Sequence, residues 1–531
     1  MFCIQRKNLE KERRYMQVKK AKKGIFHIIF SRTALVAALL ILQIVIFVQT
    51  ISMLEKHATS VYVGLIVLSM MVIVYIINRK ENPAFKMSWI LFVTLIPIVG
   101  TVFYVFMLIQ PGTSYIRKRL FVLGDETRPY MQQNPELIEE LRLSKPANAN
   151  LAHYMSSICE CPVHRNTKVT YFPLGEDKFC ELKIQLENAK RFIFMEYFIV
   201  EQGVMWDSIL EILKRKVDEG VEVRFMYDGM CSISLLPYRY PKKLEQMGIK
   251  CKMFNPIKPV LSTQQNNRDH RKICVIDGEV AFTGGVNLAD EYINEKVRFG
   301  HWKDTAVMLE GEAVQNFTIM FLQMWNIYER QKEDYTKYLT PKSDVFRREL
   351  GYVLPYGDSP YDDENIGEQV YFHILNHAKK YVHIMTPYLI LDNEMVTTLT
   401  YAAKCGIEVI IIMPHIPDKW YAFVLAKTYY EELIRAGVQI YEYTPGFVHA
   451  KVFVSDDDTA TVGTINLDYR SLYLHFECGT FIYNNQVVRD IEKDFQETLK
   501  KCQKVTITDL RNRKVGEKVC GRVLRLIAPL M

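Results

Sequence analysis

Two stretches of this 531-residue chain carry the same polar residues at the same spacing. The first runs from Asp269 to Asn287 and the second from Val448 to Asn466, and the two copies are offset by 179 positions (449 − 270). The matched residues are His270, Lys272, Asp277, Gly284 and Asn287 in the first copy, and His449, Lys451, Asp456, Gly463 and Asn466 in the second. Five matches in one frame indicate a duplicated functional motif.

Within each copy, the spacing brings the polar groups to one place. The histidine and the lysine are two positions apart in a strand-like run, so both side chains should leave the same face of that strand. A turn that contains the aspartate follows, and a return strand leads to the glycine and then to the asparagine. One copy therefore offers an imidazole, an ammonium and a carboxamide side by side.

Two such copies facing one another would suit phosphoryl transfer on a phosphodiester. The lysines and asparagines can hold the non-bridging oxygens, where negative charge must be stabilised in the transition state. One histidine can attack phosphorus to form a covalent intermediate. The other can protonate the leaving alkoxide and then deprotonate the incoming hydroxyl. This chemistry requires no metal ion, and we expect no cofactor.

The segments around the two copies predict how they are positioned. Apolar runs rich in β-branched and aromatic residues at 192–200 and 221–228 flank a segment at 206–217 that has helical spacing. The runs at 381–391 and 406–413 repeat this order. We therefore predict two pseudo-symmetric α/β domains, 151–345 and 346–531, which share one active site. Each is expected to contain a largely parallel sheet covered by helices.

The first 150 residues have a different composition. Residues 1–32 hold ten Lys and Arg against two Glu, which predicts a basic cytoplasmic tail. The predicted membrane region, 33–109, has apolar segments at 34–54, 61–77 and 89–109. Basic residues after the second and third segments favour two crossings and a third segment broken at Pro97 and Gly100; three full crossings are the alternative. Residues 110–150 are predicted to be a polar linker.

Other patterns are expected to be structural. Phe317, Phe321 and Trp325 recur at the spacing of one helix face, which predicts a helix that packs into the core. The end of the chain is predicted to be helical, and its apolar residues 523–530 could contact a membrane or pack inside the protein. The eleven cysteines show no spacing typical of a metal site, which favours reduced thiols.

From about Tyr154 to its end, the chain resembles the phospholipase D superfamily. The superfamily signature, H-x-K-x4-D followed by G-G/S-x-N, matches both copies, although Thr464 stands where serine is usual and His475 where asparagine is frequent. Within the superfamily, the sequence is most similar to the bacterial cardiolipin synthase family. The similar stretches are Met195–Phe198, Asn267–Gly278, Thr283–Tyr292, Trp302–Asp304 and Gly463–Ser471, together with Asn82-Pro83 before the third apolar segment.

The resemblance implies that two phosphatidylglycerol molecules react to give cardiolipin and glycerol through a phosphatidyl-histidine. It implies that His270 is the nucleophile, that His449 is the acid and base, and that a downstream carboxylate orients each histidine. Asp304 and Glu477 match that last role. As members of the motif, Lys272, Lys451 and the turn aspartates Asp277 and Asp456 are assigned to the catalytic set with the histidines, although the role of the two aspartates could be structural.

The expected partners are phosphatidylglycerol and anionic lipids of the cell membrane, with the catalytic domains on the cytoplasmic side. Nucleic acid is not expected, because the net charge beyond residue 32 is −1 (7 − 8) and a phosphate backbone favours a basic surface. The same motif residues would also serve a hydrolase that uses water as the acceptor. A membrane scaffold without activity is disfavoured because both motifs are intact. The sequence predicts no oligomeric state.

Overall fold

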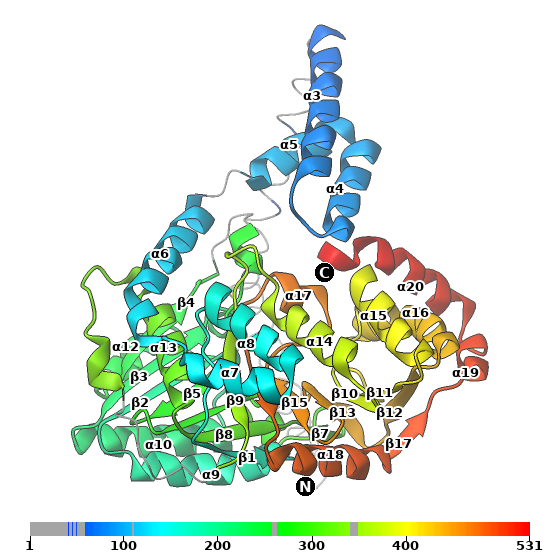
Figure 1. Ribbon diagram of the computed structural model, residues 1–531. Coiled ribbons are helices and arrows are strands. Elements are labelled where there is room, and N and C mark those ends of the chain that lie inside the picture. The colour runs from blue at the N-terminus through cyan, green and yellow to red at the C-terminus, as the bar shows by residue number, and fades with distance from the viewer. Residues whose placement is uncertain are drawn as a thin grey trace, which may run out of the picture.

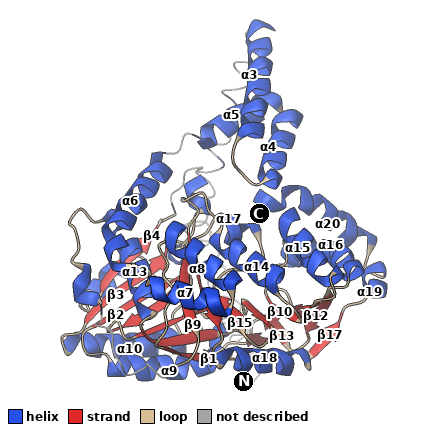
Figure 2. Ribbon diagram, in the orientation of Figure 1, coloured by secondary structure: helices blue, strands red, loops and turns tan. Residues whose placement is uncertain are grey.

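The computed structural model describes residues 41, 45, 49, 59–108, 111–257, 263–339 and 349–530. Two β-sheets lie side by side with helices packed around them, and a group of N-terminal helices projects from this body (Figures 1 and 2). The predicted basic tail, 1–32, lies outside the described residues, as does the segment 34–54 apart from residues 41, 45 and 49, which are helical.

The first sheet has the strand order β1-β8-β6-β5-β2-β3-β4. Its strands are β1 Thr167–Phe172, β2 Phe192–Tyr197, β3 Glu222–Asp228, β4 Lys250–Phe254, β5 Lys272–Ile276, β6 Val280–Gly284 and β8 Ala306–Gly311. Helices α9 (Gly175–Asn188) and α10 (Val204–Asp218) pack on the sheet face that carries Ile193 and Met195. Helix α13 (Val314–Trp325) packs on the opposite face. Phe317, Phe321 and Trp325 of α13 are buried, which confirms the predicted core-facing helix.

The second sheet has the order β17-β12-β11-β10-β14-β15-β16-β9. Its strands are β9 Tyr352–Asp358, β10 Tyr381–Met385, β11 Glu408–Pro414, β12 Gln439–Tyr443, β14 Val452–Ser455, β15 Thr459–Gly463, β16 Glu477–Tyr483 and β17 Cys502–Lys504. Helices α14 (Ile366–His377), α15 (Asn393–Lys404) and α16 (Trp420–Ala436) pack on one face, and α18 (Val487–Leu499) on the other.

The prediction of largely parallel sheets is wrong. In the described residues, four of the six strand pairs of the first sheet and five of the seven of the second are antiparallel. Only β2-β3-β4 and β10-β11-β12 are parallel, because helical crossovers join them. The duplicated motif lies on the hairpins β5–β6 and β14–β15. Strand β5 pairs antiparallel with β2, and β14 pairs antiparallel with β10.

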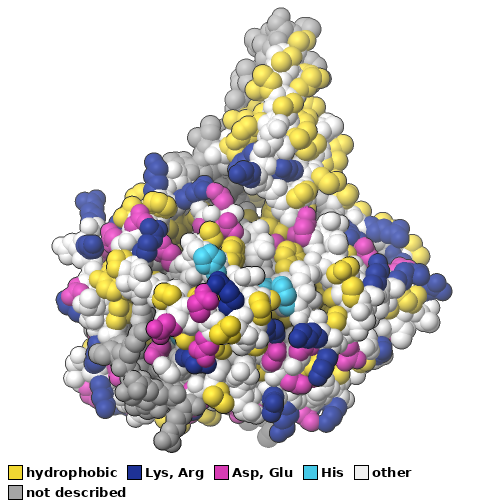
Figure 3. All heavy atoms as spheres, in the orientation of Figure 1, with side chains coloured by type: hydrophobic (Ala, Val, Ile, Leu, Met, Phe, Trp, Pro, Cys, Tyr) yellow, Lys and Arg dark blue, Asp and Glu magenta, His cyan; other side chains and the backbone are white. Residues whose placement is uncertain are grey.

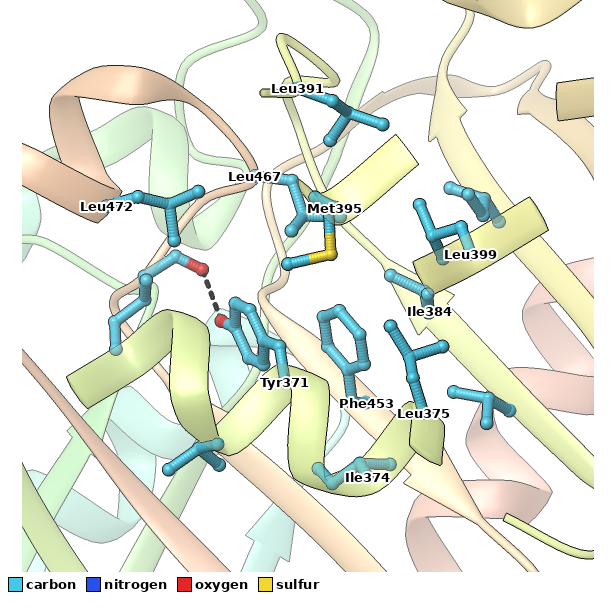
Figure 4. Close-up of a cluster of buried hydrophobic side chains, with 14 of the residues drawn as sticks. Tyr371, Ile374, Leu375, Ile384, Leu391, Met395, Leu399, Phe453, Leu467 and Leu472 are labelled. Carbon is cyan, nitrogen blue, oxygen red and sulfur yellow. Dashed lines mark hydrogen bonds between the residues drawn. The ribbon is translucent and has the colours of Figure 1, made fainter. Parts of the chain in front are cut away.

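The core of the second half supports the motif loop directly. Tyr371 of α14 stacks on Phe453 of β14 with ring centroids 4.0 Å apart, and its hydroxyl donates to the carbonyl oxygen of Ile465 at 2.7 Å (Figure 4). Leu467, two residues further on, lies in the same buried cluster. Contacts with the core therefore hold the backbone on both sides of Asn466 in place.

The N-terminal helices are α3 (Thr59–Asn78), α4 (Pro83–Leu95) and α5 (Pro97–Leu108), which pack against one another. The chain leaves the helical conformation at Ile96, as the predicted break at Pro97 requires. Gly100 allows the close approach of α4 and α5, because a Cβ there would lie 2.8 Å from the carbonyl oxygen of Phe92. Within the described residues, one helical stretch, Pro97–Tyr130, is long and apolar enough to cross a membrane.

Helices occupy most of the described residues 111–150, where a polar linker was expected. These helices are α6 Pro111–Thr127, α7 Pro135–Ser144 and α8, which extends to Ile158 from Pro146. Each begins with a proline, and Asn134 caps α7 by accepting a hydrogen bond from the backbone N–H of Glu136 at 2.9 Å. These start signals were present in a segment whose polar composition concealed them.

The first turns of α4 contact the second half of the chain. Asn82 donates from Nδ2 to Asp392 at 2.9 Å and to the hydroxyl of Tyr473 at 2.8 Å. Ser88 donates to the carbonyl oxygen of Leu526 at 3.1 Å, at the end of helix α20 (Val515–Ile527). The N-terminal helices and the C-terminal helix thus meet at one place (Figure 1).

Short elements complete the described structure. The helices are α11 Cys231–Ser234, α12 Tyr240–Glu245, α17 Tyr469–Tyr473 and α19 Ile507–Arg511, and the short strands are β7 His301–Lys303 and β13 Gly446–Val448. The 3-10 helices are η1 Arg128–Tyr130, η2 Thr263–Asn266, η3 Asp290–Ile293, η4 Asn326–Tyr328, η5 Tyr335–Tyr338 and η7 Ala528–Leu530. The predicted helical end of the chain is confirmed by α18, α19 and α20, with β17 as one short interruption.

Candidate active site

Backbone pairing between the two halves builds the site. Strand β7 of the first half pairs in parallel with β13 of the second, and a parallel bridge joins Asp269 to Phe476. The backbone N–H of His449 donates to the carbonyl oxygen of Lys303 at 2.7 Å, and that of His270 to the carbonyl oxygen of Phe476 at 2.9 Å. These bonds place His449 beside the residue after Lys303, and His270 beside the residue after Phe476.

Those following residues are the two carboxylates. Nδ1 of His270 lies 2.8 and 2.9 Å from the two carboxylate oxygens of Glu477. Nδ1 of His449 lies 2.6 Å from Oδ2 of Asp304. Both carboxylates are fully buried. A carboxylate at Nδ1 holds the proton on that nitrogen and leaves Nε2 of each ring free to face a substrate.

The two carboxylates expected to orient the histidines lie on different sides of them in the chain. Glu477 lies downstream of His270, as expected, but Asp304 lies upstream of its partner His449. Each pair joins the two halves, because the backbone ladders described above cross from one half to the other. Asp304 and Glu477 do contact the histidines, and each half completes the other.

The two lysines lie within this shared cluster. Lys272 donates to the carbonyl oxygen of His270, and Lys451 to that of His449. Burial lowers the pKa of Lys272 to about 8 and that of Lys451 to about 7, while Asp304 and Glu477 act in the opposite direction on both. Because the same two carboxylates influence both lysines, the two motif copies form one electrostatic site rather than two.

Burial also shifts the pKa values of the two motif histidines. It lowers the pKa of His270 well below the usual value, although Glu477 opposes the shift. It lowers the pKa of His449 to about 4, with Lys451 in support and Asp304 in opposition. Burial alone would raise the pKa of Glu477, but the attraction of His270 and Lys272 holds it well below its ordinary value. At neutral pH the free site thus contains two neutral imidazoles beside an ionised Glu477.

The side chains of the two motif asparagines are buried and already make hydrogen bonds within the protein. Oδ1 of Asn287 accepts from the backbone N–H of Ile199 at 3.0 Å, and its Nδ2 donates to the hydroxyl of Tyr292 at 2.8 Å. Nδ2 of Asn466 donates to Ser471 at 3.0 Å. A carboxamide nitrogen carries two N–H groups, so one in each amide remains for a phosphate oxygen. The predicted phosphate-binding role is therefore reduced to that second N–H.

The catalytic assignment of Asp277 and Asp456 is not supported by their positions. Asp277 follows β5 and accepts hydrogen bonds from the backbone N–H groups of Lys190, Arg191 and Phe192 at 2.7–2.8 Å. Asp456 makes the matching contacts with residues 379–381 at 2.7–3.1 Å. Each aspartate lies seven positions after its histidine along a mostly extended chain, a distance of roughly 20 Å. Each one fixes the end of a motif hairpin to the neighbouring strand.

Several contacts within the site were not foreseen. Thr464 donates from its hydroxyl to Glu477 and accepts from the backbone N–H of Cys478 at 3.0 Å. Gly285, its counterpart in the first copy, leaves room for Asp304, whose Oδ1 would lie 2.0 Å from a Cβ at that position. Tyr292 and Ser471, which hold the asparagines, share the offset of 179 (471 − 292). A full alignment of the two copies would have identified that pair.

Comparisons with known proteins show which family the chain resembles. The chain matches the family model for the cardiolipin synthase, phospholipase D-like domain at residues 182–325 and 371–499, and the phospholipase D-nuclease N-terminal model at residues 67–107. A cardiolipin synthase of Geobacillus thermodenitrificans is 32% identical over 506 residues, covering 94% of this chain and 99% of that protein. An uncharacterized protein of Streptococcus mutans is 51% identical over 459 residues, covering 86% of this chain and 99% of that protein.

Solved structures give the same fold. The crystal structure of phosphatidylserine synthase from Haemophilus influenzae matches with a TM-score of 0.54 at 15% identity, and the match covers 73% of this chain and 97% of that one. At that identity the likeness concerns the fold, which is the phospholipase D-like arrangement of two α/β sheets.

The position of Asp277 predicts that it stabilises the protein. Asp277→Ala leaves three backbone N–H groups without an acceptor, so the free energy of unfolding should fall by roughly 1–3 kcal/mol. Asp456→Ala should cost less, because its partners are more exposed. Glu279→Ala, an exposed change in the same turn, is the control. Thermal unfolding in detergent measures the effect. Unchanged stability combined with lost activity would restore the catalytic assignment of Asp277.

The burial of His449 predicts an unusual titration. Its pKa should be about 4 in the folded protein, against about 6.5 in an unfolded chain. Because the folded state binds this proton less readily, the stability that His449 contributes is present above pH 6.5 and is lost as the pH falls toward 4. Histidine NMR, assigned with His449→Gln, measures the pKa. Asp304→Asn should lower it further, since the carboxylate favours the charged ring. A pKa near 6.5 would contradict the buried geometry.

Proposed function

Because the chain belongs to the cardiolipin synthase family of phospholipase D-like enzymes, we propose that it transfers a phosphatidyl group from one phosphatidylglycerol molecule to another, which forms cardiolipin and releases glycerol. The observation that carries the proposal is the reciprocal pairing of His270 with Glu477 and of His449 with Asp304, beside two buried lysines. This set supplies a nucleophile, an acid–base group and positive charge for a phosphodiester.

In the first step, Nε2 of neutral His270 attacks phosphorus. A phosphorus–nitrogen bond forms, and the bond from phosphorus to the glycerol oxygen breaks. Glu477 accepts the Nδ1 proton of His270 in a hydrogen bond and stabilises the positive charge that develops on the ring. Burial favours this step, because it keeps the imidazole unprotonated and therefore nucleophilic.

His449 has the complementary task of moving protons. The anionic phosphate of a bound lipid raises the pKa of a neighbouring imidazole, so His449 can hold a proton when the leaving glycerol oxygen needs one. In the second step, a glycerol hydroxyl of another phosphatidylglycerol gives its proton to His449 and attacks phosphorus. The phosphorus–nitrogen bond breaks, cardiolipin leaves, and His270 is neutral again.

Lys272 and Lys451 would stabilise the transferred phosphate. Their depressed pKa values reflect burial, and two phosphate oxygens would supply the negative charge that keeps both ammoniums protonated. The remaining N–H groups of Asn287 and Asn466 can donate to the same oxygens. The asparagines thus contribute less than the lysines, because half of each amide nitrogen is already committed.

We place this enzyme in the cell membrane as a multi-pass protein whose catalytic halves face the cytoplasm. The projecting helices support this location, since much of their surface is apolar (Figure 3). Their exposed residues include Val63, Val67, Met70, Met71, Val74 and Ile77 of α3 and Met87, Leu91 and Leu95 of α4. The domain boundaries 151–345 and 346–531 remain part of this proposal.

The C-terminal helix α20 fits the same membrane. Its exposed apolar residues recur at helical spacing: Val515, Val519, Val523, Leu526 and Ile527. Basic residues lie along the same helix: Lys514 just before it, and Lys518, Arg522 and Arg525 within it. A helix with an exposed apolar stripe and a basic flank suits the surface of an anionic bilayer. Its contact with α4 holds it beside the projecting helices.

The reaction can be identified from its products. Purified protein in detergent micelles that contain phosphatidylglycerol should produce cardiolipin and glycerol in equal amounts, measured by lipid chromatography and a glycerol assay. Phosphatidic acid with glycerol would instead indicate transfer to water, and would reject the synthase proposal in favour of a hydrolase. Neither product from the intact protein would reject lipid phosphoryl transfer.

The role of each histidine predicts a different trapping result. With radiolabelled phosphatidylglycerol and an acid quench, His270→Ala should show no labelled protein. His449→Ala should keep a labelled protein but turn over at least roughly a thousandfold more slowly, because the intermediate waits for a base. His415→Ala, a half-exposed histidine paired with Glu442, is the control and should match the unchanged protein. Labelling that survives in His270→Ala and disappears in His449→Ala would reverse the assignment.

A further inference from the structure

A third histidine lies in the active site without a role in the steps above. The ring of His475 lies 5.5 Å from the ring of His270, measured between centroids, and its Nδ1 lies 3.8 Å from Oε1 of Glu477. Its side chain is only 10% exposed. Within the described residues, neither of its ring nitrogens has a hydrogen-bond partner. Both ring nitrogens are shielded from solvent and unpaired, so a ligand at this position would satisfy polar atoms that are otherwise left without a partner.

The neighbours of His475 provide the remaining donors of a metal site. One ligand atom each from His270, His475 and Glu477 lie within 4.8 Å of one another. Zinc binds histidine nitrogen and carboxylate oxygen at about 2.0–2.2 Å, which places tetrahedral ligand atoms roughly 3.3 Å apart. The existing separations of 2.8 Å from Glu477 to His270 and 3.8 Å to His475 bracket that value. The third separation, between the two histidine nitrogens, is at most 4.8 Å, so binding would require side-chain rotations that bring the two rings to a common ion.

We propose that His270, His475 and Glu477 bind a zinc ion that reversibly inhibits the enzyme. Two imidazoles and one carboxylate, with a fourth position open to water, form a donor set that suits zinc. Thr464 donates to the second oxygen of Glu477 and so orients the carboxylate from behind, as outer partners of metal ligands commonly do. The inhibitory part of this inference rests on the proposed function, whereas zinc binding itself does not.

Zinc at this position would block the first chemical step. The metal takes the place of the proton on Nδ1 of His270, and that proton is released to the solvent. Glu477 then binds the metal and no longer accepts the hydrogen bond that stabilises positive charge on the ring. The metal also withdraws electron density from the imidazole, which weakens Nε2 as a nucleophile. The two lysine ammoniums oppose a cation, and Asp304 and Glu477 favour it.

Zinc binding can be measured without reference to catalysis. The full-length protein in detergent is titrated with zinc in competition with a chromophoric chelator, and His475→Asn is compared with the unchanged protein. This variant keeps a polar side chain of similar size, and its affinity for the active-site ion should fall at least about tenfold. His415→Asn, outside the site, should bind zinc as the unchanged protein does. Equal binding by all three proteins, or none by the unchanged protein, would overturn the site.

The inhibition has its own test. In the phosphatidylglycerol assay, zinc at ten times its dissociation constant should lower the rate roughly tenfold, since about one site in eleven remains free, and a chelator should restore it. Whatever activity His475→Asn has should be unchanged by the same zinc. Zinc binding with an unaffected rate would reject inhibition. If zinc binds but no lipid product forms without zinc, the metal site stands and the proposed function fails. Should His475→Asn not fold, His475→Gln replaces it.

Discussion

The active site depends on an exchange of partners between two halves of one chain. Each histidine is fixed at Nδ1 by a carboxylate that belongs to the other half, and parallel backbone contacts place the two groups next to one another. A carboxylate beside an imidazole determines both its tautomer and its orientation. For the motif histidines His270 and His449, neither half by itself supplies both the ring and its carboxylate, so the interface between the sheets is part of the catalytic machinery.

This arrangement concentrates many ionisable groups in a buried space. Burial disfavours the charged forms of the histidines and lysines, and it thereby produces the neutral imidazoles that nucleophilic chemistry needs. Such a cluster is held together by surrounding structure. The aspartates at the ends of the motif hairpins fix the strands, and the core beneath Ile465 and Leu467 fixes the second motif loop. Stability and reactivity are thus located in different residues of the same repeated motif.

Much of this site could be predicted from the sequence, because the two motif copies share one spacing and strand geometry places His and Lys on one face. The α/β halves, the helix with Phe317 and the break at Pro97 follow from local patterns of the same kind. The direction of strand pairing could not be predicted, since apolar periodicity marks a strand but does not identify its neighbour. Which carboxylate serves which histidine could not be predicted for a related reason: the pairing depends on backbone contacts between residues about 150 to 210 positions apart (449 − 304 and 477 − 270). The helices between 111 and 158 were missed because capping signals were outweighed by a polar composition.

The docking of Asn82 and Ser88 on the second half has a consequence for how lipids arrive. Because hydrogen bonds tie both ends of this junction to the catalytic body, the body cannot swing away on a loose tether. In a bilayer, the length and packing of α4 would fix the height of the catalytic body above the lipid headgroups. For the proposed transfer between two lipids, both molecules would have to reach a site held at one height, and the depth of a phosphate in its leaflet would become a criterion of selection.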